Sequence, residues 1–224
     1  LCDERLFAPQ VEALASFQDP SGNPLYPTEV ADLGAYDSLQ AMAEAVFEKT
    51  RFERFALAGL SMGGALAMTM ARMDPHRVER LAVLDANPGV DDDARRENRR
   101  RQLADAERLG VGALTRSELV PLYLAPDNCS PELIDLTVAM AERHGLETYR
   151  RQLEALMTRD SSREHLADFS GPALVLCGEL DAMCAPKLHE EMAQRLPNSQ
   201  LVIIPGVGHL ATVESPQVVN AALL

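Results

Sequence analysis

The sequence predicts an α/β fold, a mostly parallel, doubly wound sheet that carries an inserted block of helices. Short apolar runs flanked by turn residues alternate with segments of helical periodicity, which is the pattern of a parallel sheet covered on both faces. The alternation stops between positions 88 and 167, where no convincing strand occurs. A chain of 224 residues has room for one such domain with its insertion.

The strands are expected in short runs rich in valine, isoleucine, leucine and alanine, since strands buried on both faces are nearly continuous in apolar residues. Five runs meet this description: Thr28–Leu33, Phe55–Leu60, Arg80–Asp85, Ala173–Gly178 and Gln200–Pro205. Helices are expected between most of them, where apolar residues recur every three or four positions: Ala8–Ala15, Ser38–Lys49, Ala65–Met73 and Leu188–Leu196.

The block from 88 to 167 is predicted to be helical. Its first helix, Asp91–Leu109, begins with three aspartates and continues with arginines, the order that the helix dipole favours. Further helices are expected near Ser117–Leu124, Pro131–His144 and Glu147–Thr158. An all-helical block inside an α/β chain is most simply an inserted cap on a core made of residues 1–87 and 168–224.

Charge and cysteine content restrict the partners and the compartment. The formal net charge is −13, and an acidic surface repels nucleic acid and anionic membranes, so neither is expected as a partner. The four cysteines show no CxxC and no metal-ligand spacing. We therefore expect no metal, and free thiols in a reducing, cytoplasmic compartment. Nothing in the sequence indicates an oligomeric state.

The segment from Phe55 to Gly64 is the most informative motif. An apolar run ends at Gly59, Ser61 stands in the pattern G-x-S-x-G, and an alanine-rich helix is expected directly afterwards. A strand, a tight turn and a helix in this order hold a serine in a strained conformation with its hydroxyl exposed at the edge of the sheet. Gly59 and Gly63 are expected because side chains at these positions would crowd the turn. Ser61 is therefore a candidate nucleophile.

A serine hydroxyl needs a base to become nucleophilic, and the base needs an orienting acid. Asp181 and His209 follow the last two expected strands. Loops at the carboxyl ends of parallel strands gather at one edge of the sheet, so we expect Ser61, Asp181 and His209 to converge there. Asp85 also ends an expected strand and is the second candidate for the acid, since Asp181 directly precedes the strand unit of His209.

These motifs resemble the α/β-hydrolase superfamily, in particular its small cap-bearing esterases, lactonases and enol-lactonase-like members. The resemblance rests on Gly59-Leu-Ser-Met-Gly-Gly64, Gly178-Glu-Leu-Asp181 and Gly208-His209, and it covers essentially the whole chain. It implies the α/β-hydrolase fold, with a triad in the chain order Ser…Asp…His and a helical cap at 88–167.

The first ten residues look like the segment that follows the oxyanion loop of this superfamily. The resemblance then implies a central strand before Leu1, and a sheet without that strand would leave buried backbone groups unpaired. We expect roughly 20–30 residues to precede Leu1 in the functional molecule, the length that two or three strands with their turns need.

The activity that the resemblance implies is hydrolysis of a small carboxylic ester or lactone through an acyl-enzyme, without a cofactor. The backbone N–H of Met62 is expected to be one oxyanion donor. The second donor is expected at Leu1 or at the residue before it. Met183, Leu60 and Leu210 flank the catalytic positions in the sequence and are the candidates for the wall of the substrate pocket.

Three questions stay open at this stage. The same triad also serves C–C bond hydrolysis, acyl transfer, perhydrolysis and lyase steps, and the same scaffold can serve as a non-catalytic receptor for a small ligand. The basic run Arg95–Arg101 is either a solvated helix face neutralised by nearby acids, which is favoured, or a binding site for a substrate carboxylate.

Overall fold

A parallel sheet of four strands forms the centre of the computed structural model, which describes residues 1–224. All neighbouring strands run parallel, and their order in the sheet is the order in the chain: β1 (Phe55–Leu60), β2 (Val78–Leu84), β3 (Ala173–Gly178) and β4 (Ser199–Ile204). These four lie within two residues of the predicted runs. Parallel pairing brings all four carboxyl ends to one edge.

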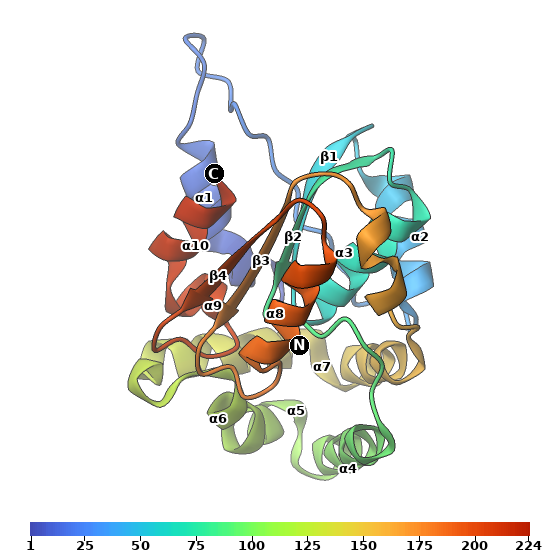
Figure 1. Cartoon of the computed structure of the whole chain (residues 1–224). Helices are drawn as coiled ribbons and strands as arrows, with labels where there is room; N and C mark the ends of the chain where they lie inside the picture. The colour runs from blue at the N-terminus through green and yellow to red at the C-terminus, as the bar shows by residue number, and fades with distance from the viewer.

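Ten α-helices accompany the sheet, several of them at their predicted positions (Figure 1). They are α1 (Ala8–Ala15), α2 (Leu39–Lys49), α3 (Met62–Met73), α4 (Asp93–Leu109), α5 (Val111–Leu114), α6 (Val120–Tyr123), α7 (Pro131–Thr158), α8 (Pro186–Arg195), α9 (Ala211–Glu214) and α10 (Pro216–Leu223). Two predicted helices merge into α7, where Gly145 interrupts the helical backbone with φ 71°.

Helices cover both faces of the sheet, as expected for a doubly wound fold. Alternate residues of one strand point to opposite faces. Leu81 and Val83 of β2 pack in a core cluster with α2, α3 and α8, whereas Ala82 and Leu84 pack in a second cluster with residues of α9 and α10. Figure 1 shows α1 and α10 together on one side of the sheet and α2 and α3 on the other.

The run Thr28–Leu33 forms no strand, which corrects the prediction from the sequence. It lies in the long irregular connection between α1 and α2, and residues 28 to 32 are exposed. No backbone hydrogen bond joins this run to β1, whose edge away from β2 is unpaired. A strand needs a ladder of backbone hydrogen bonds to a neighbour, and this run makes none with the sheet.

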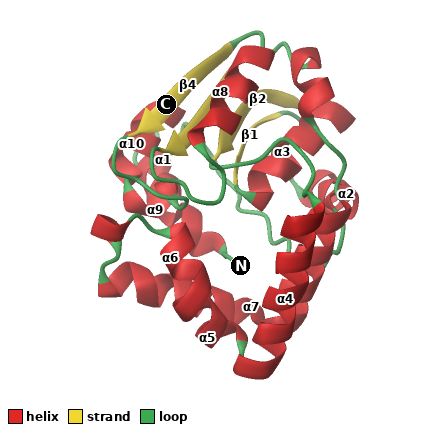
Figure 2. Ribbon diagram, turned by 60° about the horizontal axis from the view of Figure 1, so that its bottom comes forward, coloured by secondary structure: helices red, strands yellow, loops and turns green.

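The helices between β2 and β3 form a separate layer, made of α4, α5, α6 and α7. This layer lies beyond the carboxyl ends of the strands, and Figure 2 shows the N-terminus of the chain between the layer and the sheet. The loops that follow β1, β3 and β4 therefore face the helical layer. Any group bound at these loops lies between the sheet edge and the helices.

Candidate active site

Ser61 occupies the single residue between β1 and α3. Its backbone has φ 56° and ψ −114°, a conformation that non-glycine residues rarely adopt. The turn is held because the Ser61 N–H donates a hydrogen bond to the Leu84 carbonyl of β2 at 2.9 Å. A strained backbone that its surroundings enforce is characteristic of functional sites. The backbone takes this conformation because the chain must reverse direction between β1 and α3 within a single residue.

Two glycines make this close reversal possible. A Cβ at Gly59 would lie 2.0 Å from the Gly63 carbonyl oxygen, and a Cβ at Gly64 would lie 2.6 Å from the Cβ of Ala86. Gly63 itself has open space around the position of a Cβ. The expectation that a side chain at position 63 would crowd the turn is therefore wrong: the backbone of Gly63 crowds Gly59, and the second sterically required glycine is Gly64.

Ser61, His209 and Asp181 are joined in one chain of hydrogen bonds. The Ser61 Oγ lies 2.9 Å from Nε2 of His209, and Nδ1 of the same ring lies 3.0 and 2.9 Å from the two carboxylate oxygens of Asp181. A carboxylate only accepts hydrogen bonds, so Nδ1 carries the proton and Nε2 is free to accept the serine hydroxyl proton. His209 and Asp181 are both buried.

Backbone contacts fix the orientation of the acid and the base. Asp181 Oδ1 accepts hydrogen bonds from the backbone N–H groups of Met183 and Cys184, both at 2.8 Å. The His209 N–H donates to the Tyr123 carbonyl at 2.8 Å, and the two rings pack with centroids 5.6 Å apart. Tyr123 ends α6, so the helical layer holds the loop that carries the histidine.

Asp85, the second candidate for the acid, does not contact His209. Its carboxylate accepts hydrogen bonds from Gly178 N–H at 2.9 Å and from Ala211 N–H at 3.3 Å. These groups belong to the segments that carry Asp181 and His209, so Asp85 ties the two loops together. Complete burial, reinforced by the nearby Asp181 charge, raises the pKa of Asp85 well above its usual value.

His189 of α8 lies beneath the same loops and is fully buried. Its Nε2 accepts a hydrogen bond from Ala86 N–H at 2.9 Å, so Nδ1 carries the proton and faces the Ala185 carbonyl at 3.4 Å. Burial lowers the pKa of His189 to about 4, although the Asp181 charge opposes the shift. Nothing in the sequence pattern of α8 indicated that this histidine supports the site.

The residues predicted for the oxyanion hole lie beside Ser61. Met62 is the first residue of α3, where backbone N–H groups have no partner within the helix. Met62 and Leu1 both line the cavities next to the serine. Of the predicted pocket residues, Met183 lines the smaller cavity, while Leu60 and Leu210 are buried and border the larger one.

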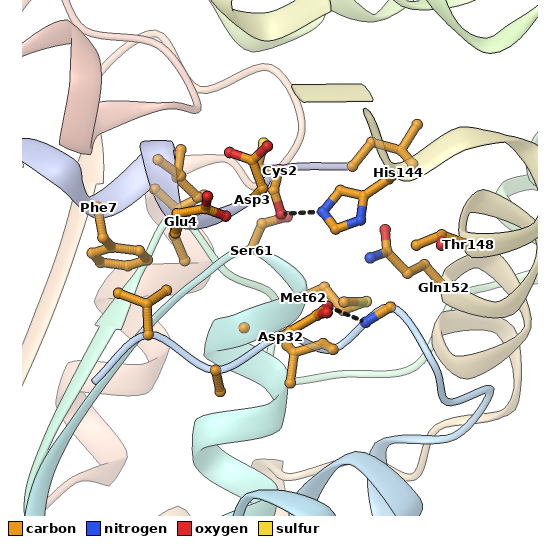
Figure 3. Close-up of a pocket in the computed structure, with 18 of the residues that line it drawn as sticks. Cys2, Asp3, Glu4, Phe7, Asp32, Ser61, Met62, His144, Thr148 and Gln152 are labelled. Atoms are coloured by element: carbon orange, nitrogen blue, oxygen red, sulfur yellow. Dashed lines mark hydrogen bonds between the residues drawn. The ribbon is translucent and has the colours of Figure 1, made fainter. Parts of the chain in front are cut away.

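The larger cavity, about 740 Å³, opens between the N-terminal segment, the loop at 30–35 and α7. Figure 3 shows Ser61 and Met62 in its centre, with Cys2, Asp3 and Glu4 on one side and His144, Thr148 and Gln152 on another. His144 Nε2 lies 3.0 Å from the Cys2 carbonyl oxygen, which links α7 to the N-terminal segment.

The smaller cavity, about 90 Å³, lies between Ser61 and the helical layer. Its lining combines apolar side chains, among them Leu119, Leu153 and Leu156, with polar ones. Besides Met183 it contains these polar side chains: Asn87, Arg95, Arg99, Gln102, Tyr123, Tyr149, Gln152 and Arg159. The sequence did not indicate most of these residues, because a polar residue that faces a cavity cannot be distinguished in the sequence from a polar residue on an exposed helix face.

Asp181, Cys184 and His209 also bring three metal-ligating atoms within 4.8 Å of one another. The Asp181 oxygens are engaged by His209 and two backbone N–H groups. Burial raises the pKa of the Cys184 thiol far above its usual value, which disfavours the thiolate that binds metals. The donor set fits an oriented acid and base better than a metal.

Comparison with known proteins agrees with this geometry. The model of the alpha/beta hydrolase family matches residues 11–222. The chain belongs to the alpha/beta hydrolase family. The family and the fold predicted from the sequence are therefore confirmed. None of the helices combines the length and the hydropathy that a transmembrane span requires.

Several relatives of this chain are hydrolytic enzymes, which agrees with the prediction that the chain is an enzyme. It is 32% identical over 173 residues to the protein of Serratia proteamaculans named "Putative carbamate hydrolase RutD", covering 74% of this chain and 62% of that one. A thermophilic esterase from Thermogutta terrifontis, solved with malate bound, is 28% identical with a TM-score of 0.84, over 99% of this chain and 84% of that one. The enol-lactonase of Burkholderia xenovorans LB400 shares the fold, at 22% identity and a TM-score of 0.81, over 99% and 85% of the two chains. The chain spans about half to two thirds of the length of several curated relatives that it matches.

The crowding at the nucleophile turn can be tested with two substitutions in one motif. Gly59→Ala places a methyl group on the Gly63 backbone, so we expect the free energy of unfolding to fall by about 3 kcal/mol or more. Gly63→Ala is the matched control and should stay within about 1 kcal/mol of the parent protein. Urea denaturation measures both, and an equal effect of the two substitutions would contradict the described geometry.

Buried His189 should make stability depend on pH. Its imidazole binds a proton near pH 6.5 in the unfolded chain and near pH 4 in the folded chain, so acid favours unfolding in this interval. We expect this group to remove about 3 kcal/mol of stability between these pH values and none above pH 7.

The control for this prediction is His189→Gln, whose amide oxygen can accept the Ala86 N–H but does not titrate. Urea denaturation of both proteins from pH 4 to pH 7 isolates the histidine, since the other groups, including Asp85, Asp181 and His209, remain in each. Parallel curves for the two proteins would show that His189 is not held neutral by the fold.

Proposed function

We propose that this protein is a serine hydrolase that cleaves a small carboxylic ester or lactone through an acyl-enzyme. The observation that carries the proposal is the unbroken chain of hydrogen bonds from Ser61 through His209 to Asp181. Such a chain transfers the hydroxyl proton to the imidazole as the oxygen attacks a carbonyl carbon, and the buried carboxylate stabilises the imidazolium that forms.

In this mechanism Ser61 Oγ attacks the carbonyl carbon and His209 receives its proton. The Met62 N–H at the start of α3 donates to the developing oxyanion, with a second donor proposed at Leu1. His209 then gives its proton to the leaving alcohol, and a water molecule deprotonated by the same imidazole hydrolyses the acyl-enzyme. Removing a single oxyanion donor typically costs about 10²–10³-fold in rate.

We further propose that residues 88–167 act as a cap on a core made of residues 1–87 and 168–224. Helices α4 to α7 face the strand ends, and Tyr123 contacts the histidine loop through two backbone hydrogen bonds. A roof over the nucleophile limits substrate size and excludes water. We also propose a cytoplasmic location, and the support for it is the four free cysteines and their spacing.

A different reaction on the same triad is the second candidate. Two relatives are named as an acetyltransferase component, from Pseudomonas putida, and as a putative carboxylate synthase, from Bacillus subtilis. The nucleophile and its base can be the same in these reactions. What differs is the bond that breaks or the group that accepts the acyl group. The test of the proposal must therefore detect the nucleophile separately from ester turnover.

Ser61→Ala tests the nucleophile. A fluorophosphonate probe is expected to label the parent protein and not the variant, and turnover of short p-nitrophenyl esters should fall by roughly 10⁴-fold or more. Ser16→Ala changes an exposed serine and is the control that should keep both properties.

Three other outcomes would change the proposal. Labelling that persists in Ser61→Ala would refute the nucleophile. Labelling without ester turnover would favour another reaction on the same triad. Failure of the probe and of every ester with the parent protein would favour a non-catalytic ligand receptor.

A further inference from the structure

The wall of the smaller cavity that faces Ser61 carries three arginines. Arg95 and Arg99 are four residues apart on α4, so they lie on the same face of this helix. Arg159 follows the end of α7 and joins them from a distant part of the sequence. All three line the cavity together with Ser61 and Met62. Positive charge that lines a cavity next to a nucleophile restricts the charge of what can bind there.

One carboxylate serves two of these arginines. The fully buried Asp91 accepts a hydrogen bond from Arg99 Nε at 2.5 Å and from Arg159 Nη2 at 3.2 Å. Arg159 Nε donates to the Gly89 carbonyl, a neutral partner. Burial lowers the pKa of Arg159, the direction expected for a guanidinium without full anionic compensation.

Arg95 has no acidic partner. Its Nη2 donates to the Met183 carbonyl at 3.3 Å, and the two nearest aspartates in the chain are engaged elsewhere. Asp92 accepts from the Arg95 backbone N–H as the helix cap, and Asp93 pairs with Arg96. Three guanidinium groups therefore face one carboxylate, in a protein whose overall charge is strongly negative.

The other arginines of the run are neutralised outside the cavity. Arg96 pairs with Asp93, Arg100 pairs with Glu97, and Arg101 pairs with Asp105 and Glu118. The two interpretations of the run Arg95–Arg101 thus apply to different residues. One face of α4 is a compensated surface, whereas the cavity face carries Arg95, which has no acidic partner, and Arg99, which shares Asp91 with Arg159.

We propose that this arginine wall binds a carboxylate of the substrate, so that the ester or lactone cleaved at Ser61 carries a second, anionic end. This inference rests on the proposed hydrolase function. The planar fork of an arginine matches a carboxylate with two parallel hydrogen bonds, and Tyr149 and Gln152 add neutral hydrogen-bonding groups to the same cavity. A cavity of about 90 Å³ has room for only a few heavy atoms, which suits a carboxylate on a short carbon chain.

The test compares two methyl esters of the same shape. Monomethyl succinate ends in a carboxylate, and methyl 4-methylpentanoate ends in an uncharged isopropyl group of similar form. The quantity measured is the ratio of kcat/KM for the acidic ester to kcat/KM for the neutral one. We expect this ratio to exceed about 10 in the parent protein, and to fall about 10- to 100-fold in Arg95→Gln, the effect of losing a hydrogen bond to a charged group.

Matched variants separate binding from folding. Arg95 is exposed on one side and bonded only to a backbone carbonyl, so Arg95→Gln should fold normally. Arg99→Gln should lower the ratio in the same direction. Arg100→Gln, on the outer face of the same helix, should leave the ratio unchanged. A parent ratio near one, or a ratio that does not respond to Arg95→Gln, would overturn the proposed carboxylate site while leaving the hydrolase function in place.

If the parent protein cleaves neither ester, that result counts against the proposed hydrolase function and leaves the carboxylate site to be tested by binding. Calorimetric titration of Ser61→Ala with monomethyl succinate should then give an affinity at least about 10-fold higher than the same titration of the Ser61→Ala, Arg95→Gln double variant. Equal affinities, or no binding to either protein, would overturn the carboxylate site.

Discussion

The parallel pairing of the four strands is the constraint on which the site depends. Because β1, β3 and β4 run in the same direction, the residues that follow them lie at one edge of the sheet even though they are about 150 positions apart in the chain. The chain of hydrogen bonds through Ser61, His209 and Asp181 is a consequence of this arrangement. No local interaction within any one loop would bring these groups together.

A second layer of buried polar groups holds these loops in position. Asp85 bonds to the backbone on both sides of the site, and His189 bonds to the backbone directly after Asp85. Buried polar groups are costly unless they are satisfied, so each of these contacts fixes a loop geometry that the fold would otherwise leave free. Stability and site geometry are therefore coupled: a change at Asp85 or His189 is expected to move the loops that carry Asp181 and His209.

The sequence allowed the central part of this site to be predicted because its signals are local. Ser61 stands in a turn motif, and Asp181 and His209 each follow an apolar strand, so a parallel sheet alone implies that they meet. The predicted strand at Thr28–Leu33 was wrong because a strand forms only where a neighbouring strand pairs with it, which a short apolar run cannot reveal. The loop-tying contacts of Asp85, and the meeting of Arg159 with Arg99 across Asp91, depend on long-range packing and have no signature in the local pattern.

The central claim is that three side chains act as one unit. The most direct measurement is kcat/KM for a short ester in Ser61→Ala, His209→Ala, Asp181→Ala and the triple variant. If the three side chains act as one unit, Ser61→Ala and His209→Ala should each lose about as much activity as the triple variant, roughly 10⁴–10⁶-fold. The reason is that the remaining two side chains cannot catalyse the reaction once one of these is removed. Losses that multiply from one substitution to the next, or a His209→Ala variant that keeps most of its activity, would contradict the claim.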